Sequence, residues 1–164
     1  MVIRKQFPRF LSPYCIALEK SVGAVVFRVE NGERQYLVIK YRNGHWEFPR
    51  GHIEDDETEI DTMRREILEE VNVTELEVVP SFRENIRFFY TAQGRERKER
   101  CAQKNCIFVH KKATFYLVEV QALDTIALSH EHTDFVWLTF PEAYEKLTFA
   151  NARSVLKKAH QHVC

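Results

Sequence analysis

The chain has 164 residues, of which 45% are hydrophobic and 29% are charged, a composition typical of soluble globular proteins and a length that favours one domain. Its 24 basic and 24 acidic side chains cancel, which excludes an overall field favouring nucleic acid or a membrane, so we expect no extended nucleic-acid surface. No stretch approaches the ~20 apolar residues of a membrane span.

Residues 1–18 are predicted to be an N-terminal extension outside the core. Pro8 and Pro13 interrupt its short apolar runs, which argues against a signal peptide, so we expect a cytoplasmic protein. The cysteines are too sparse for a disulfide scaffold in a chain of this length, and reduced thiols are therefore expected. They are Cys15, Cys101, Cys106 and Cys164.

Two strands joined by a hairpin follow the extension. Residues 21–29 and 35–41 are rich in β-branched and aromatic side chains, which favours strands. Asn31 and Gly32 lie between them and are typical of a hairpin turn. A second Asn-Gly turn at residues 43–44 precedes a short extended segment.

The hydrophobic period then changes from that of a strand to that of a helix. Ile60, Met63, Ile67 and Val71 are spaced 3, 4 and 4 residues apart, which predicts a helix over residues 57–71. Strands are predicted next at 75–79, 86–90, 107–120 and 135–138, a charged solvated loop at 94–101, and closing helices at 141–147 and 151–162. Together these elements predict the α/β (α+β) class.

The predicted helix carries three carboxylates on one arc. Glu69 and Glu70 follow Glu66 by three and four residues, spacings at which like charges repel on a helix, and Arg65 can compensate only Glu69 at i+4. A solvated charged face is one interpretation. The alternative is a site for a hard divalent cation, which binds several carboxylate oxygens. The basic turn before the helix, around Arg50, favours this alternative because a metal beside a positive charge suits a phosphate substrate.

At these residues the sequence resembles the Nudix hydrolases, whose box is G-x5-E-x7-R-E-U-x-E-E-x-G-U, with U a bulky aliphatic residue. Asn72 replaces the second Gly, and a left-handed Asn at a helix end is compatible with that position. The resemblance implies an α/β/α sandwich around a central mixed sheet. It also implies hydrolysis of a nucleoside diphosphate linked to another group, with Mg²⁺ or Mn²⁺. The matching residues are Gly51, Glu57, Arg65, Glu66, Ile67, Glu69, Glu70 and Val73.

The resemblance also implies a role for each matched position. Glu66, Glu69 and Glu70 are expected on the metals, with the Gly51 carbonyl as a further ligand. Arg65 is expected to orient a carboxylate and to belong to the catalytic set, and Glu57 to support it.

Three local features resemble the asymmetric dinucleoside tetraphosphate hydrolases within the family. Residues 45–52, HWEFPRGH, offer His45, Arg50 and His52 to a substrate. Residues 108–117 offer Lys111 for a phosphate and Phe115 for stacking on a base. The third feature is the Ser-His-Glu-His loop at 129–132, which offers Glu131 as a further metal ligand or base.

Each of these features also has a plainer interpretation. Lys111 can be a surface lysine, and either Phe115 or Tyr116 must face the core because they alternate across a strand. His130 and His132 can be ordinary surface residues.

The resemblance covers residues 20–160 approximately and implies cleavage of diadenosine tetraphosphate into ATP and AMP. The alternatives are a Nudix enzyme for another nucleotide substrate, namely an RNA 5′ end, ADP-ribose or an oxidised dNTP, and a non-catalytic Nudix ligand-binding module. His52 stands where RNA-end hydrolases of the family usually have Gly, which disfavours an RNA 5′ end as substrate. All box carboxylates are present, which disfavours a non-catalytic module. The oligomeric state stays open.

Overall fold

The computed structural model describes residues 15–103, 105–121 and 125–164, and within them seven strands form one mixed sheet. Residues 1–14 of the predicted N-terminal extension lie outside the described residues, whereas 16–18 already belong to the first strand. The strands are β1 (Ile16–Glu30), β2 (Glu33–Tyr41), β3 (Trp46–Glu47), β4 (Arg50–His52), β5 (Leu76–Thr91), β6 (Phe108–Val120) and β7 (His132–Leu138). The helices are α1 (Glu59–Val71), α2 (Gly94–Ala102), α3 (Phe140–Lys146) and α4 (Ala150–His162).

The sheet runs in the order β3-β2-β1-β6-β5, with β4 also paired to β1 and β7 to β2. β1 and β6 are parallel and the other pairs are antiparallel, so the predicted mixed sheet is confirmed. The predicted hairpin turn is also present, since Asn31 and Gly32 both have positive φ, at 52° and 80°.

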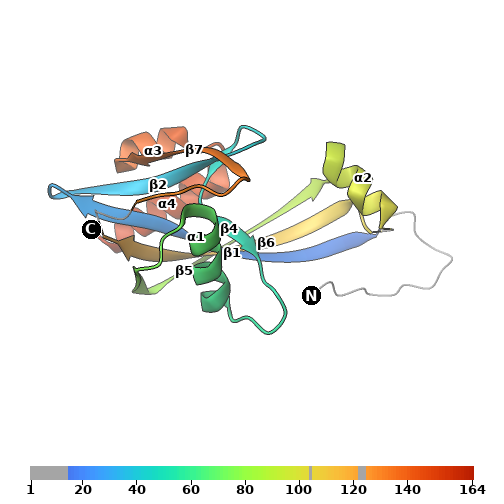
Figure 1. The fold of residues 1–164 in the computed structure, drawn as a ribbon, viewed down its shortest axis with the longest axis horizontal. Coiled ribbons are helices and arrows are strands. Elements are labelled where there is room, and N and C mark those ends of the chain that lie inside the picture. The colour runs from blue at the N-terminus through green and yellow to red at the C-terminus, as the bar shows by residue number, and fades with distance from the viewer. Residues whose placement is uncertain (1–14, 104, 122–124) are drawn as a thin grey trace.

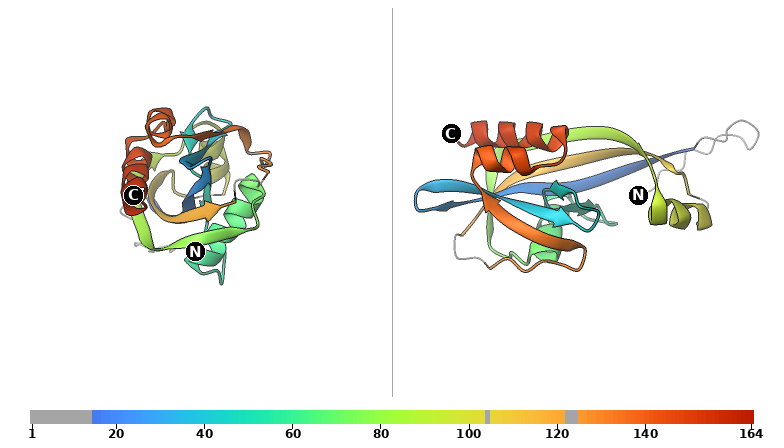
Figure 2. Two further views of the ribbon diagram at one scale, coloured as in Figure 1. Left: turned by 90° about the vertical axis from the view of Figure 1, so that its left-hand side faces the viewer. Right: turned by 90° about the horizontal axis from the view of Figure 1, so that it is seen from above.

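Two apolar cores lie on opposite faces of this sheet. Successive side chains of β1 point to opposite faces of the sheet, so Val22 and Val25 lie on different faces, and both are fully buried. On one face Val22 belongs to the same core as Met63 and Ile67 of α1. On the other face Val25 belongs to the core formed with α3 and α4. Figure 2 shows α1 and the α3–α4 pair on opposite sides of the sheet, as expected for an α/β/α sandwich.

One end of the sheet differs from expectation. β1, β5 and β6 extend beyond α1 and reach α2, which lies at the far end of the molecule (Figure 1). The charged segment at 94–101 is part of this helix, so the prediction of a loop was wrong. Two ion pairs at i,i+4 spacing explain the helix: Arg95 with Glu99 at 2.7 Å and Arg100 with Glu96 at 2.7 Å.

β5 is one strand where two were predicted. Its register with β6 shifts between Val78 and Arg83, so the strand continues on both sides of an irregular segment. Pro80 has no N–H to donate and Ser81 has a φ of 64°, and these two residues account for the interruption that the sequence pattern suggested.

The cysteines also differ from expectation. Cys15, at the start of β1, forms a disulfide with Cys106, just before β6, because the two strands run in parallel and bring these positions together. Cys101 and Cys164 are free and exposed. Among the described residues no helix is long and apolar enough to cross a membrane.

Candidate active site

The acidic helix α1 is fixed at both ends by its own side chains. Thr58 is its N-cap: the Thr58 side chain accepts from the Asp61 N–H at 3.2 Å, and the Asp61 carboxylate accepts from the Thr58 N–H at 3.1 Å. The helix therefore begins two residues later than predicted and leaves Glu57 in the preceding loop. At the other end Asn72 has φ 59° and ψ 34°, and its N–H bonds to the Leu68 carbonyl at 3.0 Å, so the left-handed cap is confirmed.

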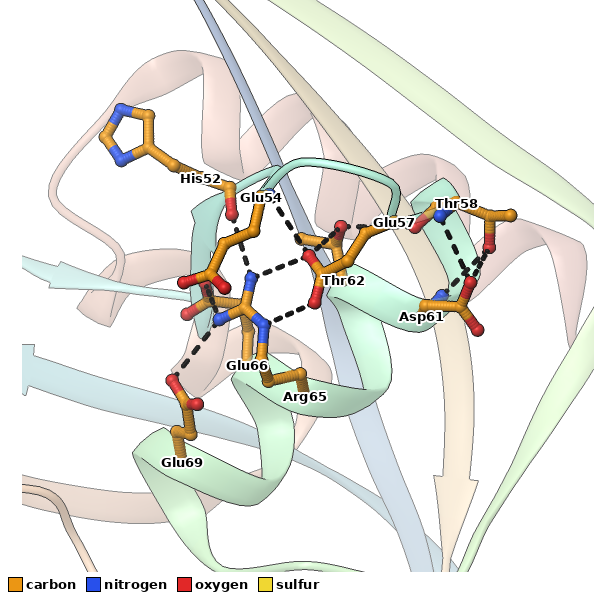
Figure 3. Close-up of polar contacts among 9 residues, drawn as sticks. All are labelled: His52, Glu54, Glu57, Thr58, Asp61, Thr62, Arg65, Glu66 and Glu69. Atoms are coloured by element: carbon orange, nitrogen blue, oxygen red, sulfur yellow. Dashed lines mark hydrogen bonds and ion pairs between the residues drawn. The ribbon is translucent and has the colours of Figure 1, made fainter. Parts of the chain in front are cut away.

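The Arg65 guanidinium lies at the centre of the acidic residues (Figure 3). It bonds to both oxygens of Glu57, with Nε to Oε1 at 2.6 Å and Nη2 to Oε2 at 2.9 Å. Its Nη1 donates to Glu66 at 2.8 Å and to Glu69 at 3.3 Å, and its Nη2 donates to the His52 carbonyl at 3.0 Å. Arg65 thus ties the loop before α1 to two of the three box carboxylates.

Glu66 and Glu70 are held against strand β4. The Glu66 carboxylate lies where a Cβ on Gly51 would be, so any side chain at position 51 would displace it. Glu70 accepts from the Arg50 N–H at 2.9 Å. Its other oxygen is 3.5 Å from Nε2 of the buried His132. This Nε2 atom has no hydrogen-bond partner among the described residues. Burial first, and then the charge of Glu66, raise the pKa of Glu70 to about 9.

These side chains line one cleft of about 560 Å³. Glu131 reaches it from the loop before β7, so the acidic wall comes from α1 and from a segment far away in sequence. Glu70 and Glu131 line the same cleft. The residues lining the cleft are Tyr41, Arg50, Gly51, His52, Glu54, Arg65, Glu66, Glu69, Glu70, Lys111, Ser129, His130 and Glu131.

Two cations border the acidic cleft, and both have anionic partners. Arg50 makes a two-point pair with Glu47, at 3.1 and 2.9 Å. Lys111 is only 9% exposed, and its ammonium is 3.8 Å from Glu19 and 3.3 Å from Nε2 of His52. Burial, and then the charge of Arg50, lower the pKa of Lys111 to about 8. Lys111 is therefore not an ordinary surface lysine.

A second cleft adjoins the first and shares Tyr41, Arg50 and Lys111 with it. It is rich in rings: His45 packs edge to face on Phe149 at 4.7 Å, and Phe88 lies 6.2 Å from Tyr90. The remaining residues that line it are Asn43, Glu47, Glu96 and Asn151.

Phe115, expected to stack on a base, lies elsewhere. It is fully buried, packs edge to face on Phe48 at 5.9 Å and belongs to the core under α3 and α4. Its ring has no exposed face for a base in this structure, so that expectation was wrong. The physical reason is the strand alternation: Phe115 points into the core, and Tyr116 on the other face donates to Glu59 at 2.9 Å.

Residues 19–159, which contain both clefts, match the NUDIX domain family. The chain belongs to the Nudix hydrolases. It is 28% identical over 156 residues to the bis(5′-nucleosyl)-tetraphosphatase (asymmetrical) of Sus scrofa, covering 88% of this chain and 95% of the relative. It is also 25% identical over 151 residues to an RNA pyrophosphohydrolase of Sulfurovum, covering 87% and 90%.

A solved structure gives the same fold. A C. elegans Ap4A hydrolase binary complex superposes with a TM-score of 0.73 at 26% sequence identity, over 88% of this chain and 97% of that one. The family and the sandwich fold predicted from the box are therefore confirmed for this Nudix hydrolase.

The donor set of this Nudix hydrolase fits a hard divalent cation. Carboxylate oxygens predominate in the acidic wall, where Glu66, Glu69, Glu70 and Glu131 line one cleft. Among the described residues no cluster of three ligands is already formed, and Arg65 bonds to Glu66 and Glu69. Arg65 contacts Oε1 of Glu66 and Oε2 of Glu69, so a cation could bind the other oxygen of each carboxylate while Arg65 keeps both in place.

Sequence reasoning missed several residues of the Nudix site, among them Glu19, Glu47, Tyr41, Phe149 and the contacts of His132. Glu47 and Glu19 anchor Arg50 and Lys111, and Glu19 was overlooked because β1 was predicted to begin after it. Tyr41 borders both clefts. His132, treated as a possible surface residue, is buried beside Glu70 and bonds through Nδ1 to the Ser129 hydroxyl at 3.0 Å. The Ser-x-x-His spacing was the available signal for this contact.

Proposed function

We propose that this Nudix hydrolase cleaves diadenosine tetraphosphate into ATP and AMP, with Mg²⁺ or Mn²⁺ bound at the acidic wall. One observation carries the proposal: Arg50 and Lys111 lie at the junction of an acidic cleft and a ring-lined cleft. A polyphosphate chain needs the cations and the metal, whereas a base needs the rings. The similarity to the tetraphosphatase of Sus scrofa supports the same substrate class.

In this proposal Glu66, Glu69, Glu70 and the Gly51 carbonyl hold the metal, and Glu131 adds a further ligand or base from the loop before β7. The bound metal supplies neutralisation of phosphate charge and activation of water for attack on phosphorus.

The protein's own groups then position the substrate. Lys111 and Arg50 bind phosphate oxygens, and their pairs with Glu19 and Glu47 keep both side chains in place before substrate arrives. The proton of the attacking water passes to a carboxylate of the cleft. Glu131 is the candidate for this role, because it lines the cleft and is not among the carboxylates that bond to Arg65. Arg65, held by Glu57, maintains the spacing of Glu66 and Glu69.

The rings of the second cleft bind one adenine. Phe149 is 37% exposed and His45 packs on it, so the Phe149 ring retains area for a base. Stacking on such a ring tolerates either purine, and the phosphate chain rather than the base therefore selects the substrate.

Product analysis tests the proposal. Purified protein with Mg²⁺ should convert diadenosine tetraphosphate into equal amounts of ATP and AMP, and EDTA should stop the reaction. Glu69→Gln and Glu70→Gln should abolish turnover, whereas Glu75→Gln, an exposed acid just beyond α1, should not. Intact tetraphosphate alongside rapid cleavage of 5′-triphosphorylated RNA, ADP-ribose or an oxidised dNTP would assign the site to that substrate instead.

A further inference from the structure

The part of the sheet that extends beyond α1 presents a row of three basic side chains. Lys20 of β1 lies opposite Lys112 of β6, and Lys112 lies opposite Arg87 of β5. All three side chains point to the α1 side of the sheet. Lys20 and Lys112 lie an even number of residues from Val22 and Val118, which belong to the core under α1. Arg87 follows Ile86, which packs against the core on the opposite face. α1 does not reach this part of the sheet (Figure 1).

Like charges directly opposite each other on neighbouring strands destabilise a sheet. Lys20 and Arg87 are exposed, and among the described residues the three side chains form no ion pair or hydrogen bond with an acid. The charge of Lys112 acts on Glu59 from a distance, but the Glu59 carboxylate is already bonded to Arg83 at 2.8 Å. The row thus carries uncompensated positive charge that an external anion would neutralise.

The next row on the same face is aromatic and apolar. His110 of β6 lies between Leu18 of β1 and Phe89 of β5. Phe89 is 72% exposed, yet it is ordered against His110, with ring centroids 4.4 Å apart and planes 13° from parallel. A large exposed ring stacked flat on a second ring offers a surface for a further planar group.

We propose that this face, which we call the platform (Lys20, Arg87, Phe89, His110 and Lys112), binds single-stranded nucleic acid. The basic row takes successive phosphates and the Phe89 ring takes an unpaired base. The stacked Phe89–His110 pair offers a planar partner for a base, which an anionic membrane lacks. The bases of a duplex are already paired and stacked, so a single strand fits the exposed ring better. The formal net charge of zero gave no sign of the platform, because it sums all charges of the chain. The three cations also lie far apart in sequence and meet only when the strands pair.

The platform lies next to the active site. His52, at the end of β4 and on the acidic cleft, is paired with Ser21 of β1, and Lys20 is the next residue along that strand. Residues 16–20 of β1 pair only with β6 among the described residues. A nucleic-acid strand that leaves the cleft past His52 would therefore cross the unpaired edge of β1 and reach Lys20.

Fluorescence anisotropy tests the proposal independently of hydrolysis. Full-length protein is titrated, in EDTA, against labelled single-stranded RNA and DNA oligonucleotides of roughly 12 nucleotides, a span within the usual range for such surfaces. Binding should weaken with salt by a slope of about −0.7 per phosphate contact, so neutralising Lys20, Arg87 and Lys112 together to Gln should remove about 2 from the slope. Phe89→Ala should weaken binding by about tenfold at fixed salt.

Matched controls separate the platform from non-specific attraction. Lys157→Gln removes one exposed charge from α4 on the other side of the sheet and should leave affinity unchanged, whereas Lys112→Gln should reduce it. Turnover of a small dinucleotide substrate should be unaffected by the platform variants. The proposal is overturned if the oligonucleotides do not bind at low salt, if Lys157→Gln and Lys112→Gln lose affinity equally, or if duplex or phosphatidylserine vesicles bind more tightly.

Discussion

Arg65 and Glu57 form a two-point pair that joins the loop before α1 to the acidic wall, with bonds of 2.6 and 2.9 Å. The Thr62 hydroxyl also donates to Glu57 at 2.8 Å, so the carboxylate is fixed from both sides. The same guanidinium bonds to Glu66 and Glu69, which means that Glu57 controls the position of two proposed metal ligands without touching the metal site itself.

Glu57→Gln should therefore reduce kcat by about 10- to 100-fold, as is usual when the partner of a ligand-orienting group is removed. The amide keeps the size of the side chain but loses the charge that holds Arg65. Asp55→Asn, in the same loop and exposed, is the matched control and should have normal kcat. Steady-state kinetics at several Mg²⁺ concentrations measures the effect, and equal activity in both variants would contradict this role of Glu57.

Phe149 and Phe115 should respond differently to truncation. Phe149→Ala removes a partly exposed ring of the second cleft and should raise KM with little change in thermal stability. Phe115→Ala opens a cavity in a fully buried core and should cost about 3–5 kcal/mol of unfolding free energy. Denaturant unfolding and KM measured on both variants separate the two roles. A stable Phe115→Ala protein with raised KM would return Phe115 to the substrate site.

Helix α1 could be predicted from the sequence, whereas the orientation of Phe115 could not. The apolar spacing of Ile60, Met63, Ile67 and Val71 predicted α1 and its buried stripe, and Asn72 predicted its left-handed end, because those features depend on neighbours within a few residues. Which face of β6 points into the core depends on the register of three strands and could not be read from Phe115 and Tyr116 alone. Glu19 and Lys111 likewise meet only because β1 and β6 pair in parallel.

The pH dependence of activity should reflect Lys111. Its pKa is lowered to about 8, so the ammonium is charged below pH 8 and neutral above it. kcat/KM should therefore fall with rising pH, approaching tenfold per pH unit well above 8. Lys111→Arg, whose side chain stays charged, should remove this alkaline limb. Glu19→Gln removes an anion that favours the charged form and should move the limb to lower pH. An unchanged limb in both variants would assign it to another group.

The disulfide between Cys15 and Cys106 closes a loop with a sequence separation of 91 residues. Loop-closure entropy predicts that breaking it lowers the unfolding free energy by roughly 4 kcal/mol, because the unfolded chain gains freedom. Dithiothreitol or Cys106→Ser should lower the Tm, whereas Cys101→Ser, which removes a free exposed thiol, should not. A Tm that dithiothreitol leaves unchanged, with both thiols shown to be reduced by titration, would show that the crosslink does not contribute to stability.

Asn72 offers a test of the helix end where this chain departs from the box. A non-glycine residue in the left-handed region costs roughly 1–2 kcal/mol, and Asn bears the least of that cost. Asn72→Gly should therefore stabilise the protein by under about 1 kcal/mol and keep full activity, since the side chain is exposed and the cap bond to Leu68 uses only the backbone. Asn72→Ala should destabilise it, because Ala keeps the Cβ and loses the local hydrogen bonding of Asn. Denaturant unfolding of both variants measures the difference, and a large loss of activity in Asn72→Gly would mean that the amide itself acts at the site.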